Sequence, residues 1–494
     1  MATALESLMD QRAHAFATAE HGAFIDGAEI APSEKTFSTV DPATGEVITT
    51  VAESEDRVVD QAVQSAAKAF EGEWGSMLPA DRETALHRFA NLVEENAAEL
   101  AQYDALEGGK PIAQVEGVDL PLAVEQFRYY AGWPTKIQGA TVPVSTPNAH
   151  VYTRRMPLGV VAAITPWNFP LCQAAIKLAP ALAAGNSVVL KPSELTSLSS
   201  LRLAQLAVEA GLPAGTVNVV TGSGAGTGQA LISHPLVNKI SFTGSEATGR
   251  HLGAEAGRSL KHISLELGGK NPNIIFADAD VAKAAAYAAT TAYFYSGQVC
   301  FSGSRLMVER SVVDEVVEAV KEHASALVLG HGLERASTMG PLASAHHREK
   351  VERYLNTVEG TGGTVAFGGS RLDRAGFFLQ PTAVIGSADS DPVVADEIFG
   401  PVLAIQPFDS LEELIPRANS GKYGLSAGVW TNDVRKAHNV AQQLRAGTVW
   451  VNTYADYNAA APFGGTKSSG LGKDCGPDGL DKFLESQTVW MSLA

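Results

Sequence analysis

A single thiol in a glycine-rich turn is the residue of this sequence best suited to covalent chemistry. Cys300 lies in the run Ser296-Gly-Gln-Val-Cys-Phe-Ser-Gly-Ser-Arg305, which follows an alanine-rich segment. A structural cysteine usually lies in an apolar element and needs no glycine neighbours, whereas a nucleophilic thiol needs access for its substrate. The turn alone is compatible with both roles, and other residues of the chain are needed to distinguish a nucleophile from a structural cysteine.

A carboxylate upstream of this turn has the surroundings of a general base. Glu266 lies in Leu265-Glu-Leu-Gly-Gly-Lys-Asn-Pro272, between two leucines and before two glycines. Burial among apolar side chains raises the pKa of a carboxyl group towards neutrality, as a general base requires. The alternative is an acid at a sheet edge that pairs with Lys270.

An amide between two prolines is a candidate for binding a developing negative charge. Asn168 lies in Thr165-Pro-Trp-Asn-Phe-Pro170, where a predicted strand gives way to a helix. An amide held there can donate a hydrogen bond to an oxyanion. The alternative is an asparagine that caps a tight turn.

Two strand ends indicate a nucleotide site, although a strict GxGxxG motif is absent. Gly244 and Ser245 follow a strand and begin a helix, where backbone N–H groups and the helix dipole favour a phosphate. Lys191 ends another predicted strand and Glu194 follows it, and a carboxylate there suits a ribose diol while repelling a 2′-phosphate. Glu194 could equally be an acid in the first turn of the next helix.

The elements that must position these residues alternate regularly. Apolar strands are predicted at 159–165, 186–191, 216–220 and 239–242, and each precedes a helix. This alternation predicts a doubly wound parallel sheet, which binds ligands at the carboxyl ends of its strands. A second α/β unit is predicted after Lys261. The polar segment 136–156 is predicted to leave its domain and pair with the C-terminal strand 488–493, in its own chain or a neighbour's.

Composition restricts the class of protein. The chain has 494 residues, 45% of them hydrophobic, which predicts a large core in roughly two to four domains. A formal charge of -17 disfavours binding to nucleic acid or anionic membranes. The three cysteines show no zinc-type spacing, so neither a disulfide framework nor a metal site is expected. The N-terminus lacks a signal-peptide pattern and no apolar run reaches about 20 residues, so we expect a cytoplasmic protein without a membrane span.

Together these motifs resemble the aldehyde dehydrogenase superfamily, whose members oxidise aldehydes to carboxylic acids with NAD(P). The resemblance runs from about Phe24 to the C-terminus. It rests on the type, order and spacing of these runs: Pro166-Trp-Asn-Phe-Pro170, Lys191-Pro-Ser-Glu194, Phe242-Thr-Gly-Ser245, Leu265-Glu-Leu-Gly-Gly-Lys270, Gly297-Gln-Val-Cys300, Glu397-Ile-Phe-Gly-Pro401 and Pro462-Phe-Gly-Gly465.

The resemblance implies a role for each matching residue. Cys300 would be the nucleophile, Glu266 the base that activates water, and Asn168, with the Cys300 N–H, the oxyanion site. The implied cofactor ligands are Lys191 and Glu194 at the adenosine ribose, Gly244 and Ser245 at the pyrophosphate, Glu397 at the nicotinamide ribose, and Phe399 and Trp167 along the cleft. Glu194 favours NAD over NADP, and Glu266 favours hydrolysis over transfer to coenzyme A.

The resemblance also implies where the aldehyde enters. The matching channel positions are Phe169, Cys172, Gln173, Ile176, Phe294, Tyr295 and Phe463, with Tyr454 and Tyr457 at the mouth. Members that oxidise quaternary-ammonium aldehydes include tryptophans among these positions, and this chain has none there. An apolar channel favours a neutral aliphatic or aryl aldehyde. Asp474 replaces a glutamate of many members, so a role in proton relay does not carry over.

The expected protein is an α/β enzyme of three parts. These are a doubly wound NAD-binding domain (1–135 and 157–260), an α/β catalytic domain (261–460) and a small β oligomerisation unit (136–156 and 461–494). The family is usually dimeric or tetrameric. The alternatives are a betaine-, amino-aldehyde or semialdehyde dehydrogenase, a relative that forms acyl-coenzyme A, and a non-catalytic binding protein.

Overall fold

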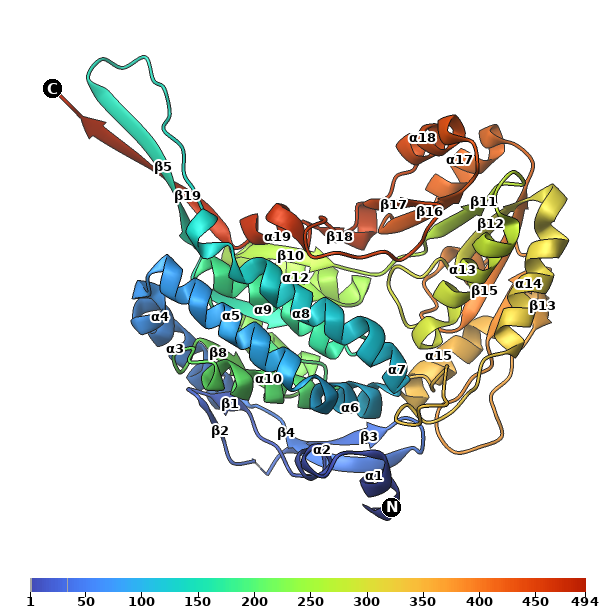
Figure 1. Cartoon of the computed structure of the whole chain (residues 1–494), viewed down its shortest axis with the longest axis horizontal. Coiled ribbons are helices and arrows are strands. Elements are labelled where there is room, and N and C mark those ends of the chain that lie inside the picture. The colour runs from blue at the N-terminus through green and yellow to red at the C-terminus, as the bar shows by residue number, and fades with distance from the viewer. Residues whose placement is uncertain (1, 33) are drawn as a thin grey trace.

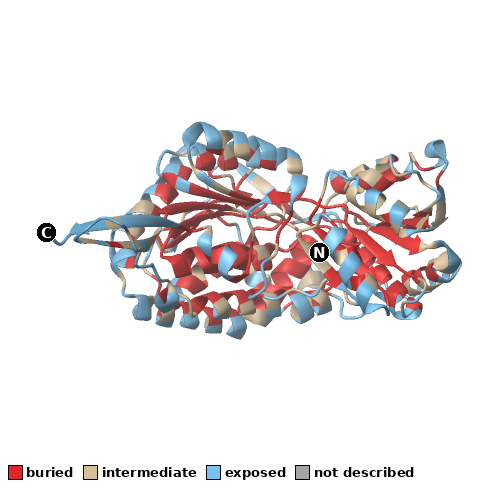
Figure 2. Cartoon of the chain, turned by 90° about the horizontal axis from the view of Figure 1, so that it is seen from above, coloured by how far each residue is buried: buried red, intermediate tan, exposed pale blue. Residues whose placement is uncertain are grey.

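Two β-sheets, each flanked by helices, form two lobes that lie side by side (Figure 1). The structure is a computed structural model and describes residues 2–32 and 34–494. The central strands of both sheets are buried, and the outer faces of the helices are exposed (Figure 2).

The larger sheet follows the doubly wound pattern predicted from the sequence. Within the described residues it has eight strands, in the order β18-β10-β9-β6-β7-β8-β1-β2. Their bounds are β1 Phe24–Ile25, β2 Ala28–Glu29, β6 Val160–Ile164, β7 Ser187–Lys191, β8 Val217–Val219, β9 Val237–Thr243, β10 His262–Glu266 and β18 Gly470–Leu471. Strands β10 to β8 in this order run parallel, and the strand order reverses between β6 and β9. Such a reversal opens a crevice for ligands.

Alternating residues of each central strand pack on opposite helical layers. In β6, Val161 and Ala163 join the core under one layer, whereas Val160 and Ala162 face the other. The first layer consists of α5 Pro79–Glu95, α6 Ala97–Gly108, α8 Leu120–Ala131, α9 Pro170–Ala184 and α10 Leu198–Glu209. The second consists of α3 Asp56–Glu71, α11 Gln229–Ser233 and α12 Glu246–Ser259. Burial on both faces explains why the strands read as continuous apolar runs.

The N-terminal part adds short elements beside the larger sheet. Strands β3 and β4 form a separate antiparallel hairpin. The bounds are α1 Ala2–Leu8, α2 Gln11–Ala17, β3 Thr36–Asp41, β4 Glu46–Ala52, α4 Glu73–Ser76 and α7 Ile112–Gln114, with a π-helical turn at Val115–Asp119 before α8.

The second sheet has seven strands in the described residues, in the order β13-β14-β15-β12-β11-β16-β17. They are β11 Pro272–Ile275, β12 Arg305–Glu309, β13 Thr364–Phe367, β14 Thr382–Ile385, β15 Val402–Phe408, β16 Ser426–Trp430 and β17 Thr448–Val451. Their helices are α13 Val281–Tyr293, α14 Val313–Ser325, α15 Ala345–Leu355, α16 Pro392–Ala395, α17 Leu411–Asn419 and α18 Val434–Gln443.

We expected this unit to begin after Lys261, but β10 pairs with β9 in the first sheet. The chain passes between the sheets at residues 267–271.

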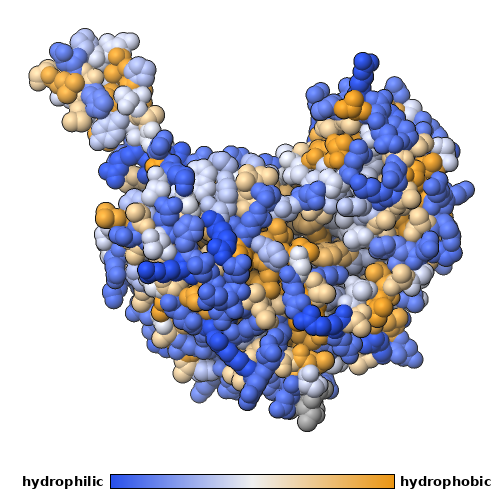
Figure 3. All heavy atoms as spheres, viewed as in Figure 1, coloured by the Kyte–Doolittle hydropathy of each residue, from blue (hydrophilic) through white to orange (hydrophobic). Residues whose placement is uncertain are grey.

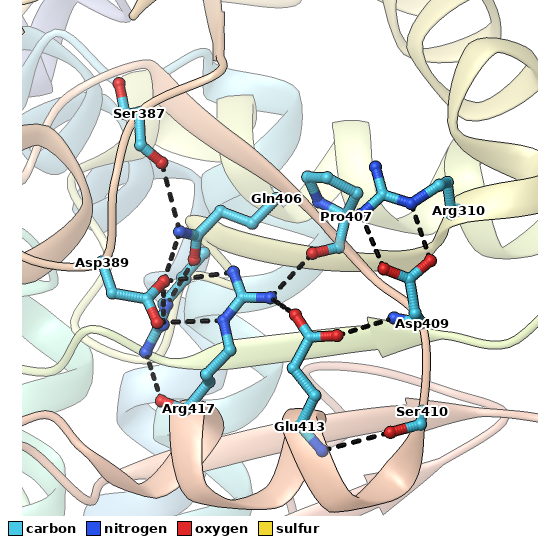
Figure 4. A network of polar contacts seen from close by, with 10 residues as sticks. Arg310, Ser387, Asp389, Gln406, Pro407, Asp409, Ser410, Glu413 and Arg417 are labelled. Atoms are coloured by element: carbon cyan, nitrogen blue, oxygen red, sulfur yellow. Dashed lines mark hydrogen bonds and ion pairs between the residues drawn. The ribbon is translucent and has the colours of Figure 1, made fainter. Parts of the chain in front are cut away.

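A network of charged and amide side chains links strands β12 and β15 of the second sheet (Figure 4). Asp389 accepts hydrogen bonds from Arg417 at 2.9 Å and from Gln406 at 2.6 Å. Arg305, the first residue of β12, donates to Gln406 at 2.8 Å and to Asp389 at 3.1 Å. Arg310 makes a two-pronged pair with Asp409 just after β15. The network therefore holds together β12 and β15, the two strands that follow Cys300 and Glu397.

The chain also forms a two-stranded arm that projects from the larger lobe (Figure 1). Its strands are β5 Ala149–Pro157 and β19 Leu484–Ser492, paired antiparallel from Leu484↔Pro157 to Ser492↔Ala149. The predicted pairing of segment 136–156 with the C-terminal strand is thus confirmed, within one chain. The segment 461–494 contributes more than the arm, since it contains β18, next to β10 in the larger sheet, and α19 Gly476–Asp481. No helix in the described residues is long and apolar enough to span a membrane.

Candidate active site

The turn that carries Cys300 has an unusual backbone. It joins α13 to β12, and Tyr295, Ser296 and Gly297 have φ values of 48°, 55° and 71°. Non-glycine residues adopt such values at a cost of order 1–3 kcal/mol each, and functional sites often contain them. Two side-chain hydrogen bonds offset this cost: the Tyr295 hydroxyl donates to Gly108 O at 3.3 Å, and Ser296 Oγ donates to Gly340 O at 2.7 Å.

Glycine lets this turn approach the loop that carries Glu397. A Cβ on Gly297 would lie 2.1 Å from the carbonyl oxygen of Gly400, and a Cβ on Gly268 would lie 1.9 Å from Glu397 Oε2. At Gly297 the contact is with backbone and excludes a side chain, whereas a side chain at Gly268 would displace the Glu397 carboxylate. The Gly269 N–H then donates to Glu397 Oε1 at 2.9 Å. Glycines that follow Glu266 and precede Cys300 thus bring a second carboxylate to the same place.

Glu266 is the last residue of β10 and is 7% exposed. Among the described residues its Oε2 has no hydrogen-bond partner, and a Cβ on Gly464 would lie 2.3 Å from its Oε1. Burial raises the pKa of Glu266 to about 8, opposed by the positive charges of Lys482, Lys177 and Lys473. A carboxyl group that titrates near neutrality and has an unpaired oxygen suits a general base. The alternative, a pairing of Glu266 with Lys270, is not made, since Lys270 Nζ donates to Val393 O instead.

Two lysines near Glu266 could not be predicted from the sequence. Lys177, on α9, is fully enclosed, and burial lowers its pKa to about 8. The side chain of Lys482 is only 9% exposed and forms an ion pair with Asp474. Each lysine is brought to the site by an element distant in sequence, so only the fold reveals the grouping.

Asn168 lies where β6 ends and α9 begins, and it is 4% exposed. Its Nδ2 donates to the Gln298 carbonyl oxygen at 2.9 Å. This bond orients the amide across the gap between the two sheets and uses one of its two hydrogens. The other hydrogen remains for a ligand beside Cys300.

A polar cavity of about 200 Å³ lies between the carboxyl ends of β6, β9 and β10 and the Glu397 loop. It is lined by Pro166, Trp167, Asn168, Gln173, Thr243, Gly244, Ser245, Glu266, Leu267, Gly268, Cys300, His347, Lys350, Glu397 and Phe399. Ser245 caps α12 by accepting a hydrogen bond from the Thr248 N–H. Trp167 packs edge-on against Phe399, with ring centroids 5.4 Å apart. The cavity gathers five of the seven predicted cofactor residues.

The other two predicted cofactor residues lie one strand further along the sheet. Lys191 ends β7 and is 2% exposed, with its Nζ donating to Pro192 O at 2.9 Å. The half-exposed carboxylate of Glu194 lies 3.9 Å from this ammonium group. The donor set fits an extended dinucleotide: a carboxylate near each end for a ribose diol, and a helix N-terminus between them for the diphosphate.

An apolar cavity of about 220 Å³ reaches Cys300 from the other side. It is lined by Val118, Leu122, Phe169, Cys172, Gln173, Ile176, Thr243, Glu266, Leu267, Tyr287, Thr290, Thr291, Phe294, Val299, Cys300, Phe301, Leu425, Tyr454, Ala455, Tyr457, Phe463 and Asp474. All the predicted channel residues lie in this lining except Tyr295. Tyr295 is fully buried behind Phe169, at a centroid distance of 5.8 Å, because its hydroxyl is directed to Gly108.

Five of the lining residues that the sequence did not suggest come from two helical segments. Thr290 and Thr291 lie three and four residues after Tyr287 on α13, and Val118 and Leu122 lie four apart at the π-helical turn and α8. The spacing along α13 was a usable signal, because residues three or four apart share a helix face. Nothing in the sequence indicated that this face, or that of α8, turns towards Cys300.

A buried ion pair supports the wall of the apolar cavity. Lys110 and Asp119 form it, both with fully buried side chains. The Lys110 ammonium lies 3.7 Å from the ring centre of Phe169 and 4.0 Å from that of Tyr295. Paired and stacked in this way, the charge stiffens the wall without entering the cavity lining.

The two cavities share five lining residues: Gln173, Thr243, Glu266, Leu267 and Cys300. Burial, with the charges of Glu397 and Glu266, raises the pKa of the Cys300 thiol to about 12, and burial raises that of Glu397 to about 7. The resting thiol is therefore protonated, and positive charge in the polar cavity would favour its ionisation. This arrangement is that of a nicotinamide-dependent oxidoreductase that works through a cysteine.

The chain belongs to the aldehyde dehydrogenase family, whose profile matches residues 30–489. It is 46% identical to a putative aldehyde dehydrogenase of Bacillus subtilis (strain 168) over 95% of both chains. It is 43% identical to the phenylacetaldehyde dehydrogenase of Pseudomonas fluorescens over 93% of both. The structure of a Bacillus cereus aldehyde dehydrogenase in complex with NAD+ superposes with a TM-score of 0.97 at 44% identity, covering 98% of this chain and 99% of that one.

Proposed function

We propose that this protein oxidises neutral aryl or aliphatic aldehydes to carboxylic acids with NAD, through a thioester on Cys300. The observation that carries the proposal is the meeting of an apolar and a polar cavity at Cys300 and Glu266. The size and lining of the apolar cavity suit an aromatic ring or a short chain. The similarity to a phenylacetaldehyde dehydrogenase supports the same class of substrate.

The first half of the proposed mechanism takes place at Cys300. Cys300 releases its proton to solvent, and the thiolate adds to the carbonyl carbon of the aldehyde, whose oxygen becomes negatively charged. The second N–H of Asn168 and the backbone N–H of Cys300 would stabilise this oxyanion. NAD, when bound, would supply an acceptor for the hydride that leaves this carbon, so that the carbonyl forms again as a thioester on the sulfur. The Glu397 carboxylate and the N-terminus of α12 would hold the cofactor.

The second half requires Glu266. Its carboxylate removes a proton from a water molecule, which attacks the thioester carbonyl carbon. The carbon–sulfur bond breaks, the acid leaves, and the thiol is restored. Because Lys177 lies close enough to shift the pKa of Glu266, it would stabilise the ionised base.

The first test is NADH formation by the purified protein across an aldehyde panel, with NAD and with NADP. The panel holds phenylacetaldehyde, benzaldehyde, short and long aliphatic aldehydes, betaine aldehyde, an ω-amino aldehyde and a semialdehyde with a carboxylate. We expect neutral aldehydes with NAD to give the highest kcat/KM. Preference for a charged aldehyde would contradict the substrate class. Dependence on coenzyme A would identify an acyl-transferring relative, and binding of NAD without any turnover would identify a binding protein.

We further propose a cytoplasmic homodimer or homotetramer assembled through the β5–β19 arm. Trp490, Met491 and Leu493 on this arm are 58%, 47% and 64% exposed. Figure 3 shows hydrophobic side chains gathered on the arm, which stands clear of the lobes. Light scattering would give the mass of the assembly. A chain that stays monomeric at micromolar concentration would refute this proposal.

A further inference from the structure

The five residues that pass between the two sheets also contact the loops that carry Cys300 and Glu397. The passage begins after Glu266, at the end of β10, and ends before Pro272, at the start of β11. Two of its contacts, made through Gly268 and Gly269, fix Glu397. The last residue of the passage, Asn271, is 1% exposed and lies against the Cys300 turn.

The Asn271 amide holds the chain on both sides of Phe301. Its Nδ2 donates to Cys300 O and to Ser302 O, both at 2.9 Å. Its Oδ1 accepts from the Ser426 N–H, at the start of β16, at 3.1 Å. Two carbonyl acceptors and one N–H donor leave a single orientation for the amide, and both of its N–H groups are used.

The neighbouring contacts show why this anchor matters. The carbonyl of Phe301 is held separately by the Tyr454 hydroxyl at 2.9 Å. The carbonyls of Cys300 and Ser302 are held by Asn271. Fixing the Cys300 carbonyl fixes the ψ angle of that residue, and with it the direction of the Cα–Cβ bond that aims the sulfur.

We propose that Asn271 is a positioning residue for Cys300. It holds the thiol at the junction of the two cavities. Because only five residues separate Glu266 from Pro272, it also sets the position of the thiol relative to the Glu266 carboxylate. The assignment rests on the proposed function of Cys300 as the nucleophile. Asn271 touches neither cavity, so it acts only through the backbone of the turn.

The sharpest test is the near-isosteric exchange Asn271→Asp. The new carboxyl can donate one hydrogen bond to the carbonyls when protonated, and it repels both when ionised. We therefore expect the rate of Cys300 alkylation by iodoacetamide to fall about tenfold at pH 8.5, with part of this loss recovered at pH 6.5. Single-turnover NADH formation should follow the same pattern, while the KM for NAD stays near its wild-type value. Peptide mass spectrometry identifies the alkylated cysteine, and Cys300→Ala gives the blank.

The matched control is Asn273→Asp, the same exchange two residues further along. Asn273 is fully buried and its Oδ1 accepts from Trp430 Nε1 at 2.9 Å, on β16. A new carboxylate there can still accept this bond. We expect a lower melting temperature with unchanged alkylation and an unchanged pH profile. Equal losses of alkylation in both variants would reduce Asn271 to a structural role and overturn the proposal.

A milder variant keeps the proposal testable if Asn271→Asp does not fold. Asn271→Ser retains one donor without a charge, so it should show an intermediate loss of alkylation at every pH. Wild-type rates in a folded Asn271→Ser protein would overturn the positioning role. Alkylation needs no aldehyde, so this result stays distinct from a failure of the aldehyde panel.

Discussion

The two sheets contribute to the site through opposite ends of their strands. In the larger sheet, Asn168, Ser245 and Glu266 lie where β6, β9 and β10 end. In the smaller sheet, Cys300 and Glu397 lie in the loops that lead into β12 and β15. The carboxyl edge of one parallel sheet thus faces the amino edge of the other.

The two edges position residues by different means. At the carboxyl edge, helices begin, so capping side chains and free N–H groups are already directed at a ligand. At the amino edge, the loops that lead into β12 and β15 are held by close backbone contacts, positive φ angles and the Asn271 amide. Changes at the carboxyl edge should therefore have graded, electrostatic effects, whereas small steric changes at the amino edge should misplace the reacting atom.

The largest effect is expected at the centre of the amino edge, for Cys300→Ala. Without the sulfur no covalent adduct forms, so NADH formation should fall to background with every aldehyde. NAD affinity, measured by calorimetry, should remain, because the polar cavity keeps its other residues. The matched control is Cys475→Ser, since Cys475 is buried and lines neither cavity. Residual turnover by Cys300→Ala would rule out the thioester route.

The second-largest effect is expected at the carboxyl edge, for Glu266→Gln. Loss of the base should slow steady-state turnover by roughly 10²–10⁴-fold. Attack by Cys300 remains, so rapid mixing should show a burst of one NADH per active site. Mass spectrometry should then detect the acylated cysteine. Steady-state turnover equal to the wild type would remove Glu266 from its role.

A smaller effect, purely steric, is expected for Gly297→Ala. The added methyl group would meet the carbonyl oxygen of Gly400 at 2.1 Å, and the φ of 71° disfavours alanine. Displacing the turn by about 1 Å can cost about 10²-fold in rate. The matched control is Gly257→Ala on α12, where a Cβ meets nothing within 4 Å. If both variants kept wild-type kcat, the amino edge would not depend on close packing.

In the unmodified protein, the dependence of kcat on pH should report on Glu266, at the carboxyl edge. Since burial raises the pKa of Glu266 to about 8, the base is mostly protonated at pH 7. If hydrolysis limits turnover, kcat should rise about tenfold per unit below pH 8 and level off above it. In Glu266→Gln this rise should disappear. A flat wild-type profile between pH 6 and 9 would place the pKa or the slow step elsewhere.

The difference between the edges also explains how much could be predicted. The alternating apolar strands predicted the doubly wound sheet, and its carboxyl edge placed Asn168, Ser245 and Glu266 together. The predicted boundary at Lys261 was wrong for β10, which belongs to the first sheet. The apolar sequence of a buried parallel strand does not indicate which of two sheets the strand joins. Tyr295 was assigned to the channel, but the positive φ values of its turn direct it into the core. Lys177 and Asn271 were missed, since their contacts depend on residues far away in sequence.

The smallest effect is expected furthest from the reacting atoms, for Glu194→Gln. A neutral amide can still bind a ribose diol but no longer repels a 2′-phosphate. We expect the KM for NAD to rise a few-fold and the ratio of NADP to NAD turnover to rise by about tenfold, with kcat unchanged.

The matched control is Glu209→Gln: both carboxylates are 49% exposed and both pair with a buried cation, but Glu209 pairs with Arg202 on α10. Because Glu194 touches neither the thiol nor the base, a loss of kcat would mean that the carboxyl edge is coupled to the amino edge through the bound cofactor. An unchanged cofactor ratio would remove Glu194 from cofactor selection.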